Sequence, residues 1–288
     1  MRSTRFETRS GSRLGTRRLR RKLRMQRSDR HSYLWSPIGR IIPLVVVGLI
    51  WQAAGTFRLV DPSFLPSPVR VAYAIADLLT GREIRDNLLV TLSRAAIGLA
   101  LGSMAGVWLG LMMARSEVFR AYAAPIVGGT YSLPKSALIP LFILWFGIGT
   151  VTTVCAVFLA CLLPMVVNTF QGVRSTPRVL IWGAEAFGTP PKGMLWRVFL
   201  PHALPDIFAG LRVALGFSFV LAISSEMVAS TNGIGKLIFM YGENGAYDYM
   251  FAAIACVVVV AFLADRLLLI ATDKCLRWHE SSARRELA

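Results

Sequence analysis

The chain has 288 residues, of which 55% are hydrophobic and only 17% are charged. A soluble domain usually carries about 25% charged residues, and the mean hydropathy of +0.54 also lies on the apolar side of that class. Disordered, collagen-like, coiled-coil and disulfide-stapled chains are excluded as descriptions of the whole sequence. The class that remains is an all-α, polytopic membrane protein.

The net charge of +16 is concentrated at the N-terminus. Residues 1–40 contain thirteen Lys and Arg residues against two acidic ones, and an apolar run follows directly. We interpret 1–40 as a cytoplasmic tail that sets topology and is attracted to anionic lipid. The first thirty residues hold one aromatic side chain, Phe6, so a nucleic-acid-binding arm is disfavoured. The Arg17-Arg18 pair leaves an export signal open, but the apolar remainder of the chain favours a retained span.

Hydropathy predicts six membrane spans. A bilayer core about 30 Å thick needs about 20 apolar residues in a helix. The runs that meet or approach this length are 41–57, 95–114, two within 121–173, 207–229 and 250–271. We place the break within 121–173 at 147–150 and a kink at Pro134. Basic residues are in excess in the loops that this order puts on the N-terminal side, which predicts that both termini are cytoplasmic.

The spans divide the chain into a tail, a first helix and a five-helix core. Segment 58–86 is predicted on the extracytoplasmic face, where Pro68 begins an amphipathic interfacial helix. The core covers 87–275, and 276–288 form a cytoplasmic tail. Asp265 and Arg266, towards the inner end of the last span, are interpreted as a structural pair or as snorkelling side chains.

Four glycines recur at spacing four in the second span, which places them on one stripe of the helix. They are Gly98, Gly102, Gly106 and Gly110. Small residues allow two membrane helices to approach closely. The spacing therefore predicts a packing seam, whose partner is either a helix of the same chain or a second subunit.

Two ionisable residues within spans are candidate contacts of a translocation path. Lys135 is the one charged residue of 121–173, and charged groups at such depth are functional candidates by default. Snorkelling or a place at a subunit seam is the alternative. Glu226 lies about 20 residues into the fifth span, as a gate contact or an interfacial carboxylate. The four cysteines and three histidines have no metal-site spacing, so neither a metal nor a disulfide is predicted.

The loop 174–204 has the pattern of two short helices. Ser175-Thr176-Pro177 is typical of a helix start, and Gly188 of a helix end. Thr189-Pro190 offers a second start, and Leu200-Pro201 a second end. We predict a compact cytoplasmic docking segment, with a loop lying flat on the lipid headgroups as the alternative.

Gly188 followed by Leu200-Pro201 twelve residues later resembles the cytoplasmic loop of ATP-binding cassette (ABC) importer permeases. That loop begins Glu-Ala-Ala in the family, whereas Trp182, Gly183 and Ala184 stand here, so only the last position agrees. Further stretches between about 60 and 280 resemble nitrate/sulfonate/taurine-type permeases: 64–68, 133–149, 208–212, Glu226-Met227, 233–235 and Trp278-His279.

The resemblance implies the type I ABC importer permease fold and a bacterial inner-membrane location. It also implies a homodimer that binds two cytoplasmic ATPases and an extracytoplasmic substrate-binding protein. Transport of a small, anionic solute such as an aliphatic sulfonate, taurine or nitrate is the expected function, with a secondary transporter or channel as the alternative. The expected contacts with the ATPase are Gly188, Thr189, Pro190, Pro191, Leu195, Phe199 and Pro201.

The chain contains no GxxxxGK[ST] sequence, so it cannot form a phosphate-binding loop of its own. We therefore expect a transport subunit rather than an enzyme. Any ATP and Mg²⁺ would be bound by the partner ATPase, and this chain would hold no cofactor.

Overall fold

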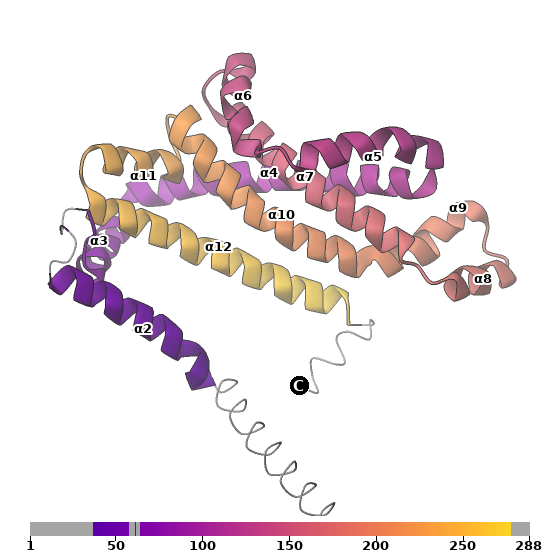
Figure 1. Ribbon diagram of the computed structural model, residues 1–288, viewed down its shortest axis with the longest axis horizontal. Helices are drawn as coiled ribbons and strands as arrows, with labels where there is room; N and C mark the ends of the chain where they lie inside the picture. The colour runs from indigo at the N-terminus through magenta and orange to yellow at the C-terminus, as the bar shows by residue number, and fades with distance from the viewer. Residues whose placement is uncertain (1–36, 58–60, 62–63, 278–288) are drawn as a thin grey trace, which may run out of the picture. The chain divides into compact units, whose positions relative to one another are not determined.

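The computed structural model describes residues 37–57, 61 and 64–277, and this part of the chain is helical and contains no strand (Figure 1). The basic tail up to residue 36, the Trp278-His279 pair and the predicted C-terminal tail beyond 277 lie outside the described residues. The chain forms two units, 1–69 and 70–288, which we describe separately.

The described part of the first unit consists mainly of helix α2, Pro37–Thr56, 20 residues long. At 1.5 Å per residue this helix is about 30 Å long, the thickness of a bilayer core. The Trp51 indole nitrogen donates to the Pro66 carbonyl oxygen at 3.0 Å. This bond joins the last turns of α2 to the segment that precedes the next helix.

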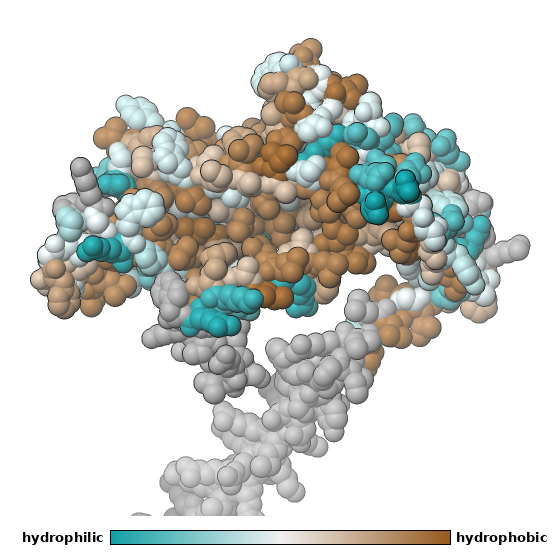
Figure 2. All heavy atoms as spheres, turned by 180° about the vertical axis from the view of Figure 1, so that it is seen from behind, coloured by the Kyte–Doolittle hydropathy of each residue, from teal (hydrophilic) through white to brown (hydrophobic). Residues whose placement is uncertain are grey.

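The second unit contains four helices long and apolar enough to span a membrane. They are α4 (Arg82–Arg115), α7 (Thr150–Arg174), α10 (Leu200–Ala229) together with the turn before it, and α12 (Tyr247–Cys275). Shorter helices are α3 (Pro68–Thr80), α5 (Glu117–Tyr131), α6 (Ile139–Phe146), α8 (Arg178–Ala186), α9 (Pro191–Met194) and α11 (Ile234–Glu243). Apolar side chains cover the central part of the face in Figure 2, with hydrophilic patches towards its edges.

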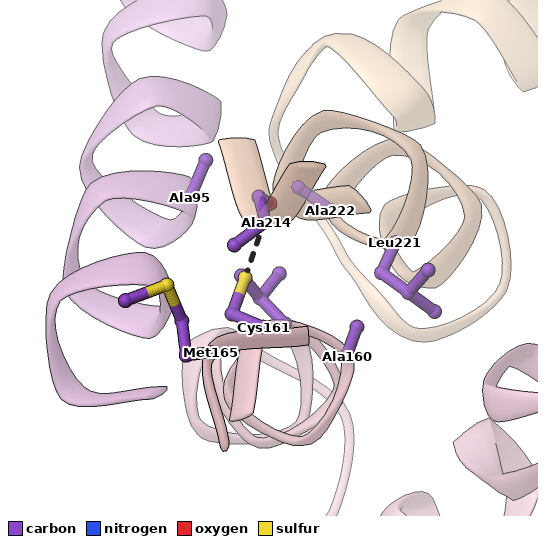
Figure 3. Packing of buried hydrophobic residues seen from close by; sticks show 8 residues of the cluster. Ala95, Ala160, Cys161, Met165, Ala214, Leu221 and Ala222 are labelled. Carbon is purple, nitrogen blue, oxygen red and sulfur yellow. Dashed lines mark hydrogen bonds between the residues drawn. The ribbon is translucent and has the colours of Figure 1, made fainter. Parts of the chain in front are cut away.

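The centre of the unit is the contact of α4 and α10 with α7. Figure 3 shows Cys161 of α7 pointing at Ala214 of α10, and Met165 of α7 on the side of α4, the helix that carries Ala95. The Cys161 thiol donates to the Ala214 carbonyl oxygen at 3.3 Å. Most of these core side chains are small, so the three helix backbones lie close together.

The four glycines of α4 lie against α7. A Cβ atom built on Gly98 would lie 2.6 Å from the Cβ atom of Val157, and one on Gly106 would lie 2.5 Å from that of Met165. Gly102 and Gly110 face α7 at similarly short distances. Within this chain, the partner of the glycine seam is therefore α7.

The 121–149 region is more sharply bent than a single kinked span. Helix α5 and the segment from Lys135 to Phe146, which begins with the 3₁₀ helix η1 (Lys135–Leu138), meet at 95°. Pro134 lies at this bend. Helix α6 ends at Phe146 and α7 begins at Thr150, and the intervening Gly147 and Gly149 have φ angles of +74° and +143°. Since L-residues rarely adopt such angles, these two glycines explain why the chain reverses there.

The prediction that a helix ends at Leu200-Pro201 is wrong. The π-helical turn η2 (Leu195–Phe199) continues directly into α10, and the Leu200 N–H donates to the Leu195 carbonyl oxygen, five residues back. Proline lacks the N–H that an α-helix would require at Pro201. The wider turn changes the hydrogen-bonding register just before the proline, so the helix continues through it.

Two contacts join α3 to the start of α12. Arg70 and Asp248 form an ion pair at 3.1 Å, and the Tyr249 hydroxyl donates to Asp77 at 2.8 Å. Helix α3 begins at Pro68 and buries Val71, Ala74 and Leu78, in agreement with the predicted amphipathic helix.

Candidate functional site

The segment between α7 and α10 lies at one end of these two helices, as the labels of α8 and α9 in Figure 1 show. The side chains that precede α8 differ from the predicted cap. Ser175 and Thr176 donate back to the carbonyl oxygens of Gly172 (2.9 Å) and Val173 (2.8 Å). These two hydroxyl groups therefore satisfy carbonyl groups at the end of α7 rather than capping α8. Pro177 is the residue directly before α8.

Gly188 closes α8 in a Schellman motif. Its φ angle is +74°, its N–H donates to the Glu185 carbonyl oxygen at 2.9 Å, and the Thr189 N–H donates to that of Ala184 at 3.0 Å. A Cβ atom on Gly188 would meet nothing within 4 Å, so the requirement for glycine is conformational. Thr189 and Pro190 then lead into α9, which begins at Pro191.

The apolar residues of this segment fall into an inner and an outer group. Met194 and Leu195 are buried within the chain, Leu195 to 8% exposure, and Phe199 is half-buried. Helix α8 buries no residue at all, and Phe187 at its end is 93% exposed. The large apolar side chains available to a partner are Val179, Leu180, Trp182, Phe187 and Trp196.

Exposed apolar side chains gathered on one element mark a surface for another molecule. Leu195 and Phe199 therefore pack against their own chain, whereas Trp182, Phe187 and Trp196 are exposed apolar side chains. None of these three was singled out from the sequence as a contact. Phe187 directly precedes the helix-ending Gly188, and this position is the sequence feature that could have indicated such a contact.

At the opposite end of α10, Glu226 is fully buried in an ion pair with Arg94 of α4. The carboxylate accepts from Arg94 (2.9 Å) and Thr91 (2.7 Å), and the two charged side chains are 3% and 0% exposed. As a candidate path contact, Glu226 thus faces its own chain rather than an open surface. The Gly235 N–H, in the first turn of α11, also donates to it at 3.1 Å.

The N–H groups at the start of helix α11 donate to side chains of α4 and α10. The N–H groups of Gly233 and Ile234 donate to Asn87 (2.6 Å) and Thr91 (2.9 Å) of α4. A Cβ atom on Gly233, whose φ angle is +107°, would collide with the Glu226 carboxylate. Side chains that accept from the first N–H groups of a helix stabilise its start. The start of α11 is therefore held by both α4 and α10.

Arg94 completes this network. Its guanidinium donates to Thr150, the first residue of α7, and to Ser230 and Asn232 after α10. Three of the four long helices, α4, α7 and α10, and the start of α11 are therefore joined by one hydrogen-bonded cluster.

Lys135 lies at the bend after α5, where it is half-buried. Its ammonium group donates to the Tyr131 carbonyl oxygen at 2.6 Å and lies 5.1 Å from the centre of the Tyr131 ring. A cation at this place satisfies a carbonyl group at the end of α5.

Long apolar helices around one core define a polytopic membrane protein, and its helix α8 leaves apolar side chains exposed. Residues 98–274 match the family of binding-protein-dependent transport system inner membrane components. The chain belongs to this family, and is thus the permease of an ABC importer, a transport subunit rather than an enzyme.

Two curated relatives align over most of their length. The taurine transport system permease of Escherichia coli is 30% identical over 262 residues, which cover 88% of this chain and 95% of the relative. A putative aliphatic sulfonates transport permease of Bacillus subtilis is 30% identical over 89% of this chain and 92% of its own length. A bacterial ABC transporter involved in the import of the polysaccharide alginate shares the fold, with a TM-score of 0.60 and 16% identity over 91% of this chain and 99% of that one.

Membership of the family implies a multi-pass protein of the inner membrane. It also implies two kinds of partner, an ATPase and a substrate-binding protein.

Proposed function

We propose that two copies of this chain form the membrane path of an ABC importer for a small anionic solute of the aliphatic sulfonate or taurine class. The names of the two relatives support the substrate class. The end that carries α8 and α9 faces the cytoplasm, with both termini on that side. The basic residues Arg174, Arg178 and Arg197 at that end support this orientation.

The observation that carries the coupling role is the exposure of α8. A helix with no buried residue, ended by a 93% exposed Phe187, has an apolar surface that the described residues leave uncovered. The ATPase covers this surface, with Gly188, Thr189, Pro190 and Pro191 at the contact. Because α9, η2 and α10 follow one another without a break, movement of the docked segment is carried along α10. The pathway then alternates between outward and inward access.

Co-purification and reconstitution test this function. The chain, its co-expressed ATPase and a binding protein are placed in proteoliposomes, and uptake of labelled taurine and ethanesulfonate is measured. We expect uptake that requires both ATP and the binding protein. Uptake driven by a proton or sodium gradient, with the chain alone in the membrane, would instead identify a secondary transporter.

Replacing Phe187 with alanine should weaken binding of the ATPase without destabilising the permease. Phe187 is exposed, so its apolar surface is free for the partner to cover, whereas Leu195 is buried against its own chain. We therefore expect Phe187→Ala to lose co-purified ATPase at an unchanged unfolding temperature. Leu195→Ala is the matched control and should lower the unfolding temperature. Full retention of the ATPase by Phe187→Ala would contradict the assignment.

Gly188→Trp should uncouple ATP hydrolysis from transport while the chain still inserts into the membrane. A side chain at φ +74° strains the turn between α8 and α9 and changes how both are presented. Substrate-stimulated ATPase activity of the reconstituted complex is the measurement. Gly183→Ala, within α8 and also in open space, is the control and should behave as wild type. Wild-type stimulation in Gly188→Trp would refute the prediction.

Lys135 is the remaining candidate for contact with the solute. If its charge attracts the anion, Lys135→Ala lowers the rate of ethanesulfonate uptake, and Lys135→Arg retains most of it. Uptake that is unchanged in Lys135→Ala leaves only the contact with Tyr131 as its role. The measurement is the initial uptake rate at equal amounts of reconstituted protein.

A further inference from the structure

An ion pair lies near the middle of two spanning helices. Arg212 is residue 13 of the 30 in α10, and Asp265 is residue 19 of the 29 in α12. At 1.5 Å per residue, each lies within about 6 Å of the midpoint of its helix. The guanidinium donates to both carboxylate oxygens of Asp265, at 2.7 and 2.9 Å. The predicted pairing of Asp265 with its neighbour Arg266 is therefore wrong.

This pair is open on one side of the chain. The side chains of Arg212 and Asp265 are 53% and 30% exposed, in contrast to the closed pair of Arg94 and Glu226. A charged side chain at the bilayer centre costs about 2.5–3.5 kcal/mol on insertion scales, and such residues usually face a water-filled cavity or other protein. We therefore infer that the face that carries Arg212 is turned towards water or protein rather than lipid.

The surroundings favour an anion at this face. Arg266, the next residue of α12, points about 100° away from Asp265, and its guanidinium lies 4.9 Å from the centre of the Phe262 ring. Counted together, Arg212, Arg266 and Asp265 give this part of the two helices an excess of one positive charge. Gly216, one turn after Arg212, has open space where a Cβ atom would stand, and Ala209, one turn before it, is exposed. Small residues on both sides leave room beside the guanidinium.

We propose that Arg212 is an anion-binding residue of the translocation pathway, with Asp265 as its counter-ion when no solute is present. A planar guanidinium binds two oxygens of an oxyanion in the same geometry in which it binds a carboxylate. A sulfonate that reaches this depth replaces the Asp265 oxygens on Arg212, and Asp265 takes the guanidinium back when the solute leaves. The assignment rests on the proposed function, because that function places a small anion in this path.

The first test separates anion binding from helix packing. In the complete reconstituted transporter, Arg212→Gln should lower ATP-driven ethanesulfonate uptake at least tenfold while ATP hydrolysis stimulated by the binding protein continues. The double variant Arg212→Met/Asp265→Leu replaces the pair by apolar side chains that can still pack α12 on α10. We expect its uptake to stay low. Recovery of wild-type uptake in this double variant would overturn the proposal.

The second test asks whether the face is in contact with water. Gly216→Cys, in the assembled transporter, is treated with an anionic and a cationic methanethiosulfonate reagent, and the wild-type chain gives the background of its four cysteines. We expect the anionic reagent to react several-fold faster than the cationic one, and the preference to disappear when Arg212→Gln is added. Absence of reaction, or a disulfide between two permease copies, would show a buried face or a subunit contact and would refute the assignment.

These experiments fail separately from the proposed function. If the wild-type transporter carries no sulfonate, the proposed substrate class is wrong, whereas thiol reactivity still reports whether the face is a positively charged aqueous one. If sulfonate is transported but the thiol of the Gly216→Cys variant is unreactive, only the role of Arg212 is lost.

Discussion

Arg94→Met is expected to lower the stability of the permease more than any other removal of a charge from the described residues. The substitution leaves the Glu226 carboxylate buried without its cation, which typically costs about 3–5 kcal/mol. Whole domains are stabilised by only about 5–15 kcal/mol. We expect the unfolding temperature of the detergent-solubilised chain to fall by roughly 10 °C. The measurement is a thermal unfolding assay that follows the fluorescence of a thiol-reactive or environment-sensitive dye.

Two controls show that burial rather than charge causes this loss. Arg120 and Glu117 form an ion pair at the same distance, 2.9 Å, but Glu117 is 88% exposed, so Arg120→Met should be nearly neutral. The double variant Arg94→Met/Glu226→Gln removes both buried charges and keeps an acceptor for the Gly235 N–H. It should be more stable than Arg94→Met alone. Equal unfolding temperatures for Arg94→Met and the wild type would show that the pair does not stabilise the fold.

Neither of the two ion pairs that join one long helix to another could be predicted from the sequence. Arg94 and Glu226 are 132 residues apart, and Arg212 and Asp265 are 53 apart, so no local pattern relates them. Adjacency suggested Arg266 for Asp265. However, consecutive helical residues point about 100° apart and do not face each other. Asp265 was therefore free to pair across the helix contact with α10.

Hydropathy did predict the long helices, because bilayer thickness imposes a length that is visible along the chain. The break at Gly147 and Gly149 was also visible, since glycine permits backbone angles that other residues avoid. The helix end at Pro201 was predicted wrongly from an equally local rule. A π-helical turn shifts the hydrogen-bonding register just before the proline, and nothing in the residue types around 195–199 indicates that shift.

In the docking segment, too, one feature could be predicted from the sequence and another could not. Gly188 as a helix end followed from residue type alone, and the Schellman bonds agree with it. The sequence could not separate Leu195, which is buried, from Phe187, which is exposed. Both are large and apolar, and only the packing of the folded chain decides which one a partner can reach.

Gly106→Val is the second substitution for which we expect a large loss of stability. A Cβ atom at this position would lie 2.5 Å from the Cβ atom of Met165 and 2.8 Å from the Leu162 carbonyl oxygen. Overpacking in protein cores typically costs about 1–3 kcal/mol. The cost here should lie at or above that range, because a backbone carbonyl cannot yield as the end of a side chain can. Separation of α4 from α7 would also disturb the helix that leads to the docking segment.

The matched control for this prediction is Gly128→Val in α5, where an added Cβ atom meets nothing within 4 Å of the same chain. It should leave the unfolding temperature of the solubilised chain within a few degrees of wild type. Gly106→Ala should fall between the two, since it adds the Cβ atom alone. A graded loss in the order Gly128→Val, Gly106→Ala and Gly106→Val would identify close backbone approach as the cause. If Gly106→Val unfolds at the wild-type temperature, α4 and α7 do not pack at this distance, and the glycines of α4 would instead serve a partner outside the chain.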